Sequence, residues 1–276
     1  MKITALVLAG KRDGALDPLA AAADVSHKCL VPIAGRPLIA HVLDALDRSP
    51  EVERIIVSVD SVATLAGVPE AQRLLATGKL QVAEAQPNLV DSIIAALRDS
   101  AYPALVTTAD NVLLTPAAVA ELARQGFDAD VLVAMARREE VLAAHPDGQR
   151  RFYRFRSGEY SNCNLYWLGS RKALDVAEVF RGGGQFAKHP ARILAAFGVM
   201  NLLRFRFGWD SIGSMFVRLS RRFGLSLRPA LMTDGALAID VDNERTHAIA
   251  GELLLARQAK AGKSTGISDT SRIAAE

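Results

Sequence analysis

The sequence is poor in cysteine, and its 276 residues include only Cys29 and Cys163. These two residues are far apart and belong to no metal-binding spacing, so neither a disulfide framework nor a zinc site is expected. A reduced, cytoplasmic setting follows as the default expectation. The chain also lacks an apolar stretch of about 18 residues, so no transmembrane helix is expected. The apolar run after Met1 is too short for a signal peptide.

Two common phosphate-binding patterns are absent, namely the Walker loop G-x-x-x-x-G-K-[ST] and the dinucleotide fingerprint G-x-G-x-x-G. The chain also lacks a large excess of either charge, because it contains 33 basic and 30 acidic residues and has a net charge of +3. This balance hides an asymmetry, since residues 148–228 are rich in arginine and poor in acid. The asymmetry predicts a local basic surface.

Apolar runs alternate with helical patterns through the first half of the chain. Strands are expected at 3–8, 54–59, 80–83, 104–108 and 130–136. Helices are expected at 37–47, 68–76, 91–98 and 116–125, the last with Thr115 as N-cap and Pro116 at its first position. This alternation predicts an α/β fold with a doubly wound, mostly parallel sheet in a Rossmann-like three-layer sandwich. Ligands of such sheets bind at the carboxyl ends of the strands.

The second half is less regular. An edge strand is expected at 151–156, and two more strands are expected at 162–168 and 236–241. Helices are expected at 173–180, 190–203, 211–223 and 244–258. We expect one domain over residues 1–260 that contains a helical, basic and aromatic insertion at 181–228. The small, polar segment 261–276 predicts a disordered tail.

A glycine-bearing turn follows the first strand, in the run Leu8-Ala9-Gly10-Lys11-Arg12. Such a turn lets backbone N–H groups approach a phosphate closely, and Arg12 and Lys28 add positive charge. On the residues alone, a strand followed by an ordinary basic surface loop remains the alternative.

Together with Lys28-Cys29-Leu30-Val31-Pro32-Ile33-Ala34-Gly35-Arg36-Pro37-Leu38-Ile39, this turn resembles the signature of nucleotidyltransferases with a glycosyltransferase-A-like fold. The molybdenum-cofactor nucleotidyltransferase branch is the most similar, and sugar-phosphate and polyol-phosphate nucleotidyltransferases are its relatives. The resemblance covers about residues 3–136 and 230–256. It implies Mg²⁺-dependent transfer of a nucleoside monophosphate from a triphosphate to a phosphorylated sugar, polyol or alcohol, with release of pyrophosphate.

The resemblance also implies roles for single residues. Leu8, Ala9, Gly10 and Arg12 would hold the triphosphate, and Lys28 would stabilise charge on the phosphates during transfer. Relatives usually carry a further glycine where Lys11 stands, and the loop 13–27 is long and rich in alanine. Both departures affect the geometry of the phosphate loop.

Three carboxylates are candidates for a metal site. Asp110 follows the strand 104–108, and alternation places Asp240 and Asp242 on one face of the expected final strand. On the residues alone, Asp110 could cap a loop, and Asp242 or Asn243 could cap the last helix. The resemblance implies instead that Asp110 and the 240–242 segment bind Mg²⁺, and of the latter pair we favour Asp240.

The resemblance further places the nucleobase at a loop-helix junction that contains Asn88 and Ser92, although each could be an ordinary helix cap. It places the acceptor beside Asn164. CTP or GTP is the favoured triphosphate, and no nucleic acid is expected, because no RNA-binding motif occurs.

The insertion 181–228 interleaves aromatic residues with arginines and allows two interpretations. Its aromatic residues could form a small core, or a basic amphipathic surface could make a peripheral contact with anionic lipid. Two alternative functions remain open: a molybdenum-cofactor nucleotidyltransferase, and a nucleotide-binding regulatory protein with a degenerate catalytic site.

Overall fold

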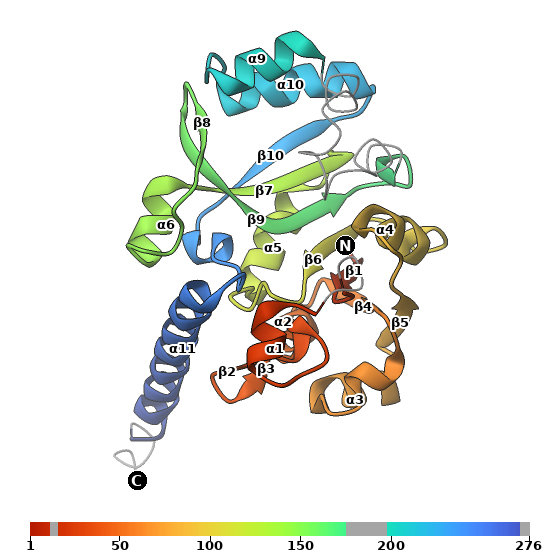
Figure 1. Cartoon of the computed structure of the whole chain (residues 1–276), viewed down its shortest axis with the longest axis vertical. Coiled ribbons are helices and arrows are strands. Elements are labelled where there is room, and N and C mark those ends of the chain that lie inside the picture. The colour runs from red at the N-terminus through yellow and green to blue at the C-terminus, as the bar shows by residue number, and fades with distance from the viewer. Residues whose placement is uncertain (12–15, 175–197, 271–276) are drawn as a thin grey trace.

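The computed structural model describes residues 1–11, 16–174 and 198–270, with the backbone alone at 261–270. An eight-stranded sheet organises the chain (Figure 1). Its strands are β1 (Ile3–Leu8), β4 (Val52–Val59), β5 (Leu80–Glu84), β6 (Ala104–Thr108), β7 (Val131–Arg137), β8 (Tyr153–Phe155), β9 (Gly158–Leu168) and β10 (Leu227–Met232). A separate two-stranded ribbon pairs β2 (Pro32–Ile33) with β3 (Arg36–Pro37).

The strands follow the order β10-β7-β9-β6-β1-β4-β5, and β8 pairs with β9 beside this path. Strands β6, β1, β4 and β5 pair in parallel, as do β10 and β7. Strand β9 runs antiparallel to both β6 and β7 and joins the two parallel groups. The predicted mostly parallel α/β sheet is therefore confirmed.

Helices cover both faces of this sheet. The α-helices are α1 (Pro18–Ala22), α2 (Leu38–Asp47), α3 (Pro69–Ala76), α4 (Leu89–Leu97), α5 (Pro116–Gln125), α6 (Arg138–Ala144), α9 (Val199–Arg206), α10 (Ile212–Phe223) and α11 (Glu244–Thr270). Within the described residues, 3-10 helices span Lys28–Leu30, Val62–Leu65 and Gly235–Ala238.

Alternation along β1 explains the three layers. Ala5 and Val7 enter a core that contains buried residues of α2 and α5, whereas Leu6 enters a second core with buried residues of α4 and α10. Successive side chains of a strand point to opposite faces, so one short strand serves both cores. No helix in the part of the chain that the structure describes is long and apolar enough to span a bilayer.

The expected strand at 236–241 is wrong. Residues Gly235–Ala238 form a 3-10 helix, and the sheet edge is provided by β10, which pairs in parallel with β7. Pro229 in β10 obscured this strand in the sequence, yet an edge strand tolerates proline because one side of its backbone needs no partner. The small residues of 235–238 instead pack against α6, where a Cβ on Gly235 would lie 2.1 Å from the backbone of Glu140.

Two other boundaries differ from the expectations. Helix α11 extends to Thr270 and so includes residues 261–270, where the composition predicts a disordered tail. Each added residue gains a hydrogen bond on an existing helix, and alanine, arginine and lysine before this segment favour its propagation. The segment 181–228, predicted to be an insertion, contains α9 and α10, and its last two residues belong to β10. The expected helical stretches 175–180 and 190–197 lie outside the described residues.

We predict that Gly235→Ala destabilises the chain by more than about 2 kcal/mol, because the new methyl group would overlap the backbone of α6. Gly213→Ala is the matched control, since a Cβ there meets nothing within 4 Å and Gly213 lies in α10. This control is expected to be neutral or to stabilise by up to about 1 kcal/mol. Urea unfolding of both variants measures the difference, and equal stability would contradict the packing argument.

Candidate active site

Lys28 forms the centre of a charged cluster at the carboxyl edge of the sheet. Its Nζ lies 2.5 Å from Asp110 Oδ2 and 2.9 Å from Asp242 Oδ1. Burial lowers the pKa of Lys28, but the charges and hydrogen bonds of Asp110 and Asp242 raise it, and the balance lies above its ordinary value. Lys28 is therefore a fixed positive charge at neutral pH.

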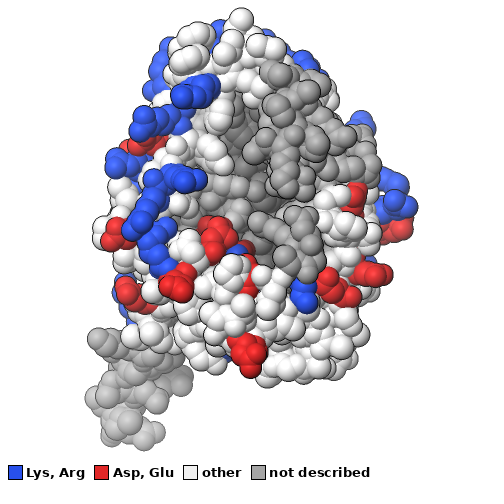
Figure 2. All heavy atoms as spheres, viewed as in Figure 1, with Lys and Arg blue, Asp and Glu red and all other residues white. Residues whose placement is uncertain are grey.

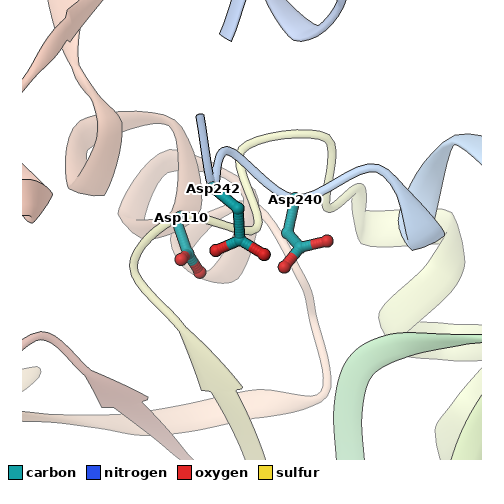
Figure 3. Close-up of side chains that lie close together, drawn as sticks. All are labelled: Asp110, Asp240 and Asp242. Atoms are coloured by element: carbon teal, nitrogen blue, oxygen red, sulfur yellow. The ribbon is translucent and has the colours of Figure 1, made fainter. Parts of the chain in front are cut away.

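Three carboxylates meet beside this lysine, as Figure 3 shows for Asp110, Asp240 and Asp242. One oxygen of each lies within 4.8 Å of the others. Asp110 follows β6, whereas Asp240 and Asp242 belong to the segment between the 3-10 helix Gly235–Ala238 and α11. The structure thus brings together the three acids that the sequence predicts as metal ligands.

The environment of Asp240 disfavours its ionised form. Burial, followed by repulsion from Asp242 and Asp110, raises the pKa of Asp240 to about 7. Among the described residues, Lys28 provides one positive charge beside three carboxylates. Clustered carboxylate oxygens of this kind are the donors that Mg²⁺ prefers, and the residues present fit a divalent cation.

Backbone hydrogen bonds hold the two acidic segments together. Val241 N–H donates to Asp110 O at 3.2 Å, which ties the 240–242 segment to the end of β6. Thr246 Oγ1 accepts from Asp242 N–H at 2.9 Å, and Asn243 Oδ1 accepts from Thr246 N–H at 3.2 Å. Asn243 therefore caps α11, while Asp242 stays available to Lys28.

Asn164 lies against the acidic cluster. Its side chain donates from Nδ2 to Asp240 Oδ2 at 2.9 Å. The residue occupies the left-handed region with a φ of 46°, in a stretch where the register between β7 and β9 shifts. Asparagine adopts this conformation more readily than most residues, and the bulge turns its amide toward the cluster. The structure therefore places Asn164 next to a predicted metal ligand.

A buried amide network supports the same bulge. Asn111 donates from Nδ2 to Cys163 O at 3.0 Å and to Thr107 Oγ1 at 3.2 Å, and Thr107 Oγ1 donates to Asn164 O at 3.0 Å. Asn111 is fully buried, immediately after Asp110. The network fixes the end of β6 relative to β9, and thus Asp110 relative to Asn164. Sequence reasoning missed the role of Asn111.

The glycine turn also has a second support that the sequence did not reveal. Lys11 N–H donates to Asp60 Oδ2 at 3.2 Å, and His27 Nε2 lies 2.8 Å from the same oxygen. Asp60 directly follows β4 and, through these contacts, joins the glycine turn to His27, the residue before Lys28. Asp60, like Asp110, comes just after a buried strand, and this position in the sequence could have identified it as a candidate site residue.

Gly10 lies where the chain leaves little room. A Cβ there would lie 2.5 Å from Ala85 Cβ, so only glycine allows this close approach of the turn to the residue after β5. Leu8 and Ala9 lead into the turn, and Ala9 N–H donates to Ser58 O at 2.8 Å. Arg12, predicted to bind phosphate, lies outside the described residues.

Asn88 and Ser92 have structural roles at the junction before α4. Asn88 Oδ1 accepts from Asp91 N–H at 2.9 Å and caps the helix. Ser92 Oγ accepts from Gln86 N–H at 2.8 Å and folds the preceding loop back. These contacts match the helix-cap alternative, and contact with a nucleobase stays a prediction for both residues.

The sequence matches the MobA-like NTP transferase domain over residues 6–196. The chain belongs to this family. The matched region includes Lys28, Asp110 and Asn164, but it ends before Asp240 and Asp242. Two of the three clustered carboxylates therefore come from chain beyond the matched region.

Solved structures agree with this assignment. A hypothetical transferase from Thermus thermophilus is similar with a TM-score of 0.73 and 25% identity, over 90% of this chain and 100% of the other. A CMP:2-keto-3-deoxy-manno-octonic acid synthetase complexed with CTP has a TM-score of 0.53 and 14% identity, over 93% of this chain and 100% of the other. The second likeness shows the fold alone. No curated protein matches the sequence.

We predict that Asp240→Asn stabilises the metal-free chain at pH 8. Folding raises the pKa of Asp240 from about 4 to about 7, so the folded chain binds a proton that the unfolded chain has lost. Wild-type stability therefore falls as pH rises through this window, and the variant escapes that loss. The gain should reach a few kcal/mol, at about 1.4 kcal/mol per pKa unit.

Thermal unfolding in EDTA at pH 4 and pH 8 measures this effect. The difference between wild type and Asp240→Asn should be large at pH 8 and small at pH 4. Adding Mg²⁺ at pH 8 should raise the melting temperature of the wild type more than that of the variant. A variant that is less stable than wild type at pH 8 in EDTA would contradict the repulsion argument.

Proposed function

We propose that this chain transfers a nucleoside monophosphate from a triphosphate to a phosphorylated sugar, polyol or alcohol and releases pyrophosphate. The observation that carries the proposal is Lys28 held between Asp110 and Asp242, beside a third carboxylate, at the carboxyl edge of the sheet. Membership of the MobA-like NTP transferase family supports a triphosphate as one substrate.

Asp110, Asp240 and Asp242 would hold Mg²⁺, which neutralises phosphate charge and orients the triphosphate when bound. Lys28 would then shift from its carboxylate partners toward the phosphates and stabilise the negative charge that develops in the transition state. The phosphate charges would then take the place of the carboxylates in keeping Lys28 protonated.

The glycine turn would provide backbone N–H groups to the triphosphate, with Arg12 as a further cation. Gly10 allows the turn to pack closely against Ala85, and Asp60 holds the turn by accepting a hydrogen bond from Lys11 N–H. The acceptor phosphate is already an anion, so its oxygen can attack the α-phosphorus without a general base. Pyrophosphate leaves from the opposite side, and catalysis consists of positioning and charge stabilisation.

Asn164 supports the acidic cluster through its bond to Asp240, in addition to the acceptor contact that the sequence predicts. An amide that orients a metal-binding carboxylate typically changes metal affinity by about 10–100-fold when it is lost. We therefore treat Asn164 as a positioning residue of the cluster that also faces the acceptor side.

We predict that Lys28→Ala lowers kcat by about 100–1,000-fold, because it removes one fixed charge from the transition state. Pyrophosphate release is measured with CTP, GTP, UTP and ATP, each with Mg²⁺, against a pool of sugar, polyol and alcohol phosphates. CTP comes first because a protein of similar fold binds it. Lys2→Ala is the matched control, since Lys2 donates only to Pro50 O at the surface.

The same assay with Asp110→Asn should show no Mg²⁺-dependent turnover. Retained nucleotide binding without turnover in the wild type, across the whole pool and with the molybdenum cofactor precursor included, would favour the degenerate regulatory protein. Turnover with that precursor alone would favour the molybdenum-cofactor alternative. Activity that survives in Lys28→Ala would remove Lys28 from the proposed mechanism.

We predict that Asn164→Gly raises the Mg²⁺ concentration for half-maximal activity by about tenfold or more. Glycine keeps the left-handed backbone at this position, so the variant removes the amide without adding strain. Activity is titrated with Mg²⁺ at saturating triphosphate and acceptor. An unchanged Mg²⁺ requirement with a raised KM for the acceptor would show that Asn164 acts on the acceptor alone.

A further inference from the structure

Helix α9 carries apolar side chains that the rest of the chain leaves exposed. None of its residues is buried. Six large apolar residues between positions 199 and 209 are exposed, and we call them the α9 face: Val199 (58%), Met200 (60%), Leu203 (41%), Phe205 (37%), Phe207 (59%) and Trp209 (54%). Such a concentration of exposed apolar side chains indicates a binding surface.

The α9 face has a defined arrangement. The rings of Phe207 and Trp209 stack with their centroids 5.3 Å apart and an interplanar angle of 19°. Phe205 packs against Tyr153 and Phe155 of β8, at centroid distances of 6.0 and 5.6 Å. These contacts hold α9 on the sheet, where Figure 1 shows it at the end of the molecule beside α10 and β8.

Positive charge surrounds this face. Residues 198–228 contain six arginines and a single acid, Asp210, which is buried. Arg204 and Arg218 both pair with Asp210, the first at 3.1 Å. Burial and the nearby charges of Arg204 and Arg221 lower the pKa of Arg218, so two guanidinium groups share one carboxylate and a third lies near them.

A fourth arginine extends the charge to the aromatic pair. Arg206 lies 6.0 Å from the ring centre of Phe207 and is exposed. Figure 2 shows basic side chains gathered along one edge of the molecule, on the side where Figure 1 places β8 and α9. Apolar and basic groups therefore lie on one surface.

We propose that the α9 face binds the surface of an anionic lipid bilayer. Valine, methionine and leucine suit acyl chains, phenylalanine and tryptophan suit the boundary with the headgroups, and the arginines suit anionic headgroups. Half of the exposed set is aliphatic and offers no stacking surface to nucleic-acid bases. A second copy of the chain fits poorly, because two such faces would bring like charges together.

The binding does not depend on catalysis, so it is tested without metal or nucleotide. The full chain is mixed with vesicles of phosphatidylcholine alone, or of phosphatidylcholine with 30% phosphatidylserine, and floated on a density gradient. Co-flotation is expected only with the anionic vesicles and should weaken in 1 M salt, where screening acts within about 3 Å.

Trp209 reports the contact directly. The other tryptophan, Trp167, is 1% exposed and lies in the core, so a vesicle-dependent change in emission reports on Trp209. The emission should shift to shorter wavelength with anionic vesicles and be quenched by lipids brominated on the acyl chain. Trp209→Phe should bind while losing both signals.

Two double variants test the apolar and the electrostatic contributions to vesicle binding separately. Phe207→Ser with Trp209→Ser should lower partitioning at least tenfold, because both rings are exposed and available to the lipid. Arg206→Gln with Arg221→Gln should lower it about 25-fold, at roughly fivefold per arginine. Phe127→Ser with Arg98→Gln is the matched control, since these exposed residues lie outside α9 and α10, and it should bind like wild type.

Absence of co-flotation with anionic vesicles would overturn the proposal, and so would equal loss in the control variant. Binding of a labelled single-stranded RNA that requires Phe207 and Trp209, without vesicle binding, would assign the α9 face to nucleic acid instead. A dimer in light scattering that the same variants dissociate, again without vesicle binding, would assign it to a second copy.

Discussion

Repulsion among Asp110, Asp240 and Asp242 is the constraint on which the rest of the site depends. Their oxygens lie within 4.8 Å of one another, and among the described residues Lys28 pairs with Asp110 and Asp242. Burial, followed by repulsion from Asp242 and Asp110, raises the pKa of Asp240 to about 7, so ionised Asp240 is disfavoured in the folded chain. A folded chain would lose this arrangement unless strong, directional contacts held each backbone in place.

Those contacts come from distant parts of the chain. The bond from Val241 N–H to Asp110 O joins β6 to the segment before α11, and the buried amide of Asn111 joins β6 to the bulge of β9. Close packing of Gly235 on α6 determines where the 240–242 segment starts. One backbone hydrogen bond and several buried side-chain hydrogen bonds therefore connect the segments that carry the three acids.

Apolar runs and helix-capping residues in the sequence correctly predicted the strands and helices that depend on neighbouring residues alone. The strand 104–108 and the helix 116–125 agree with β6 and α5 residue by residue, since a buried run and a Thr-Pro start leave few alternatives. Strand β10 was missed because Pro229 is compatible with a strand only at a sheet edge, and the sequence does not show which strand is the edge. Lys28 and the three acids were predictable from resemblance, whereas Asn111 and Asp60 act across strands that are neighbours only in the folded sheet.

The chain between β9 and Asp240 has to return to the sheet, and α10 and β10 accomplish this. Ile212, Phe216 and Leu219 of α10 are buried in the core shared with β7 and β10, so hydrophobic burial explains that helix. Helix α9 gains no such burial, although five of its eight residues are large and apolar. Folding alone gives no reason to keep apolar residues where water covers them, because polar substitutes would cost little stability at exposed positions. Their presence beside an arginine cluster is accounted for when the surface has a partner that is itself apolar and anionic.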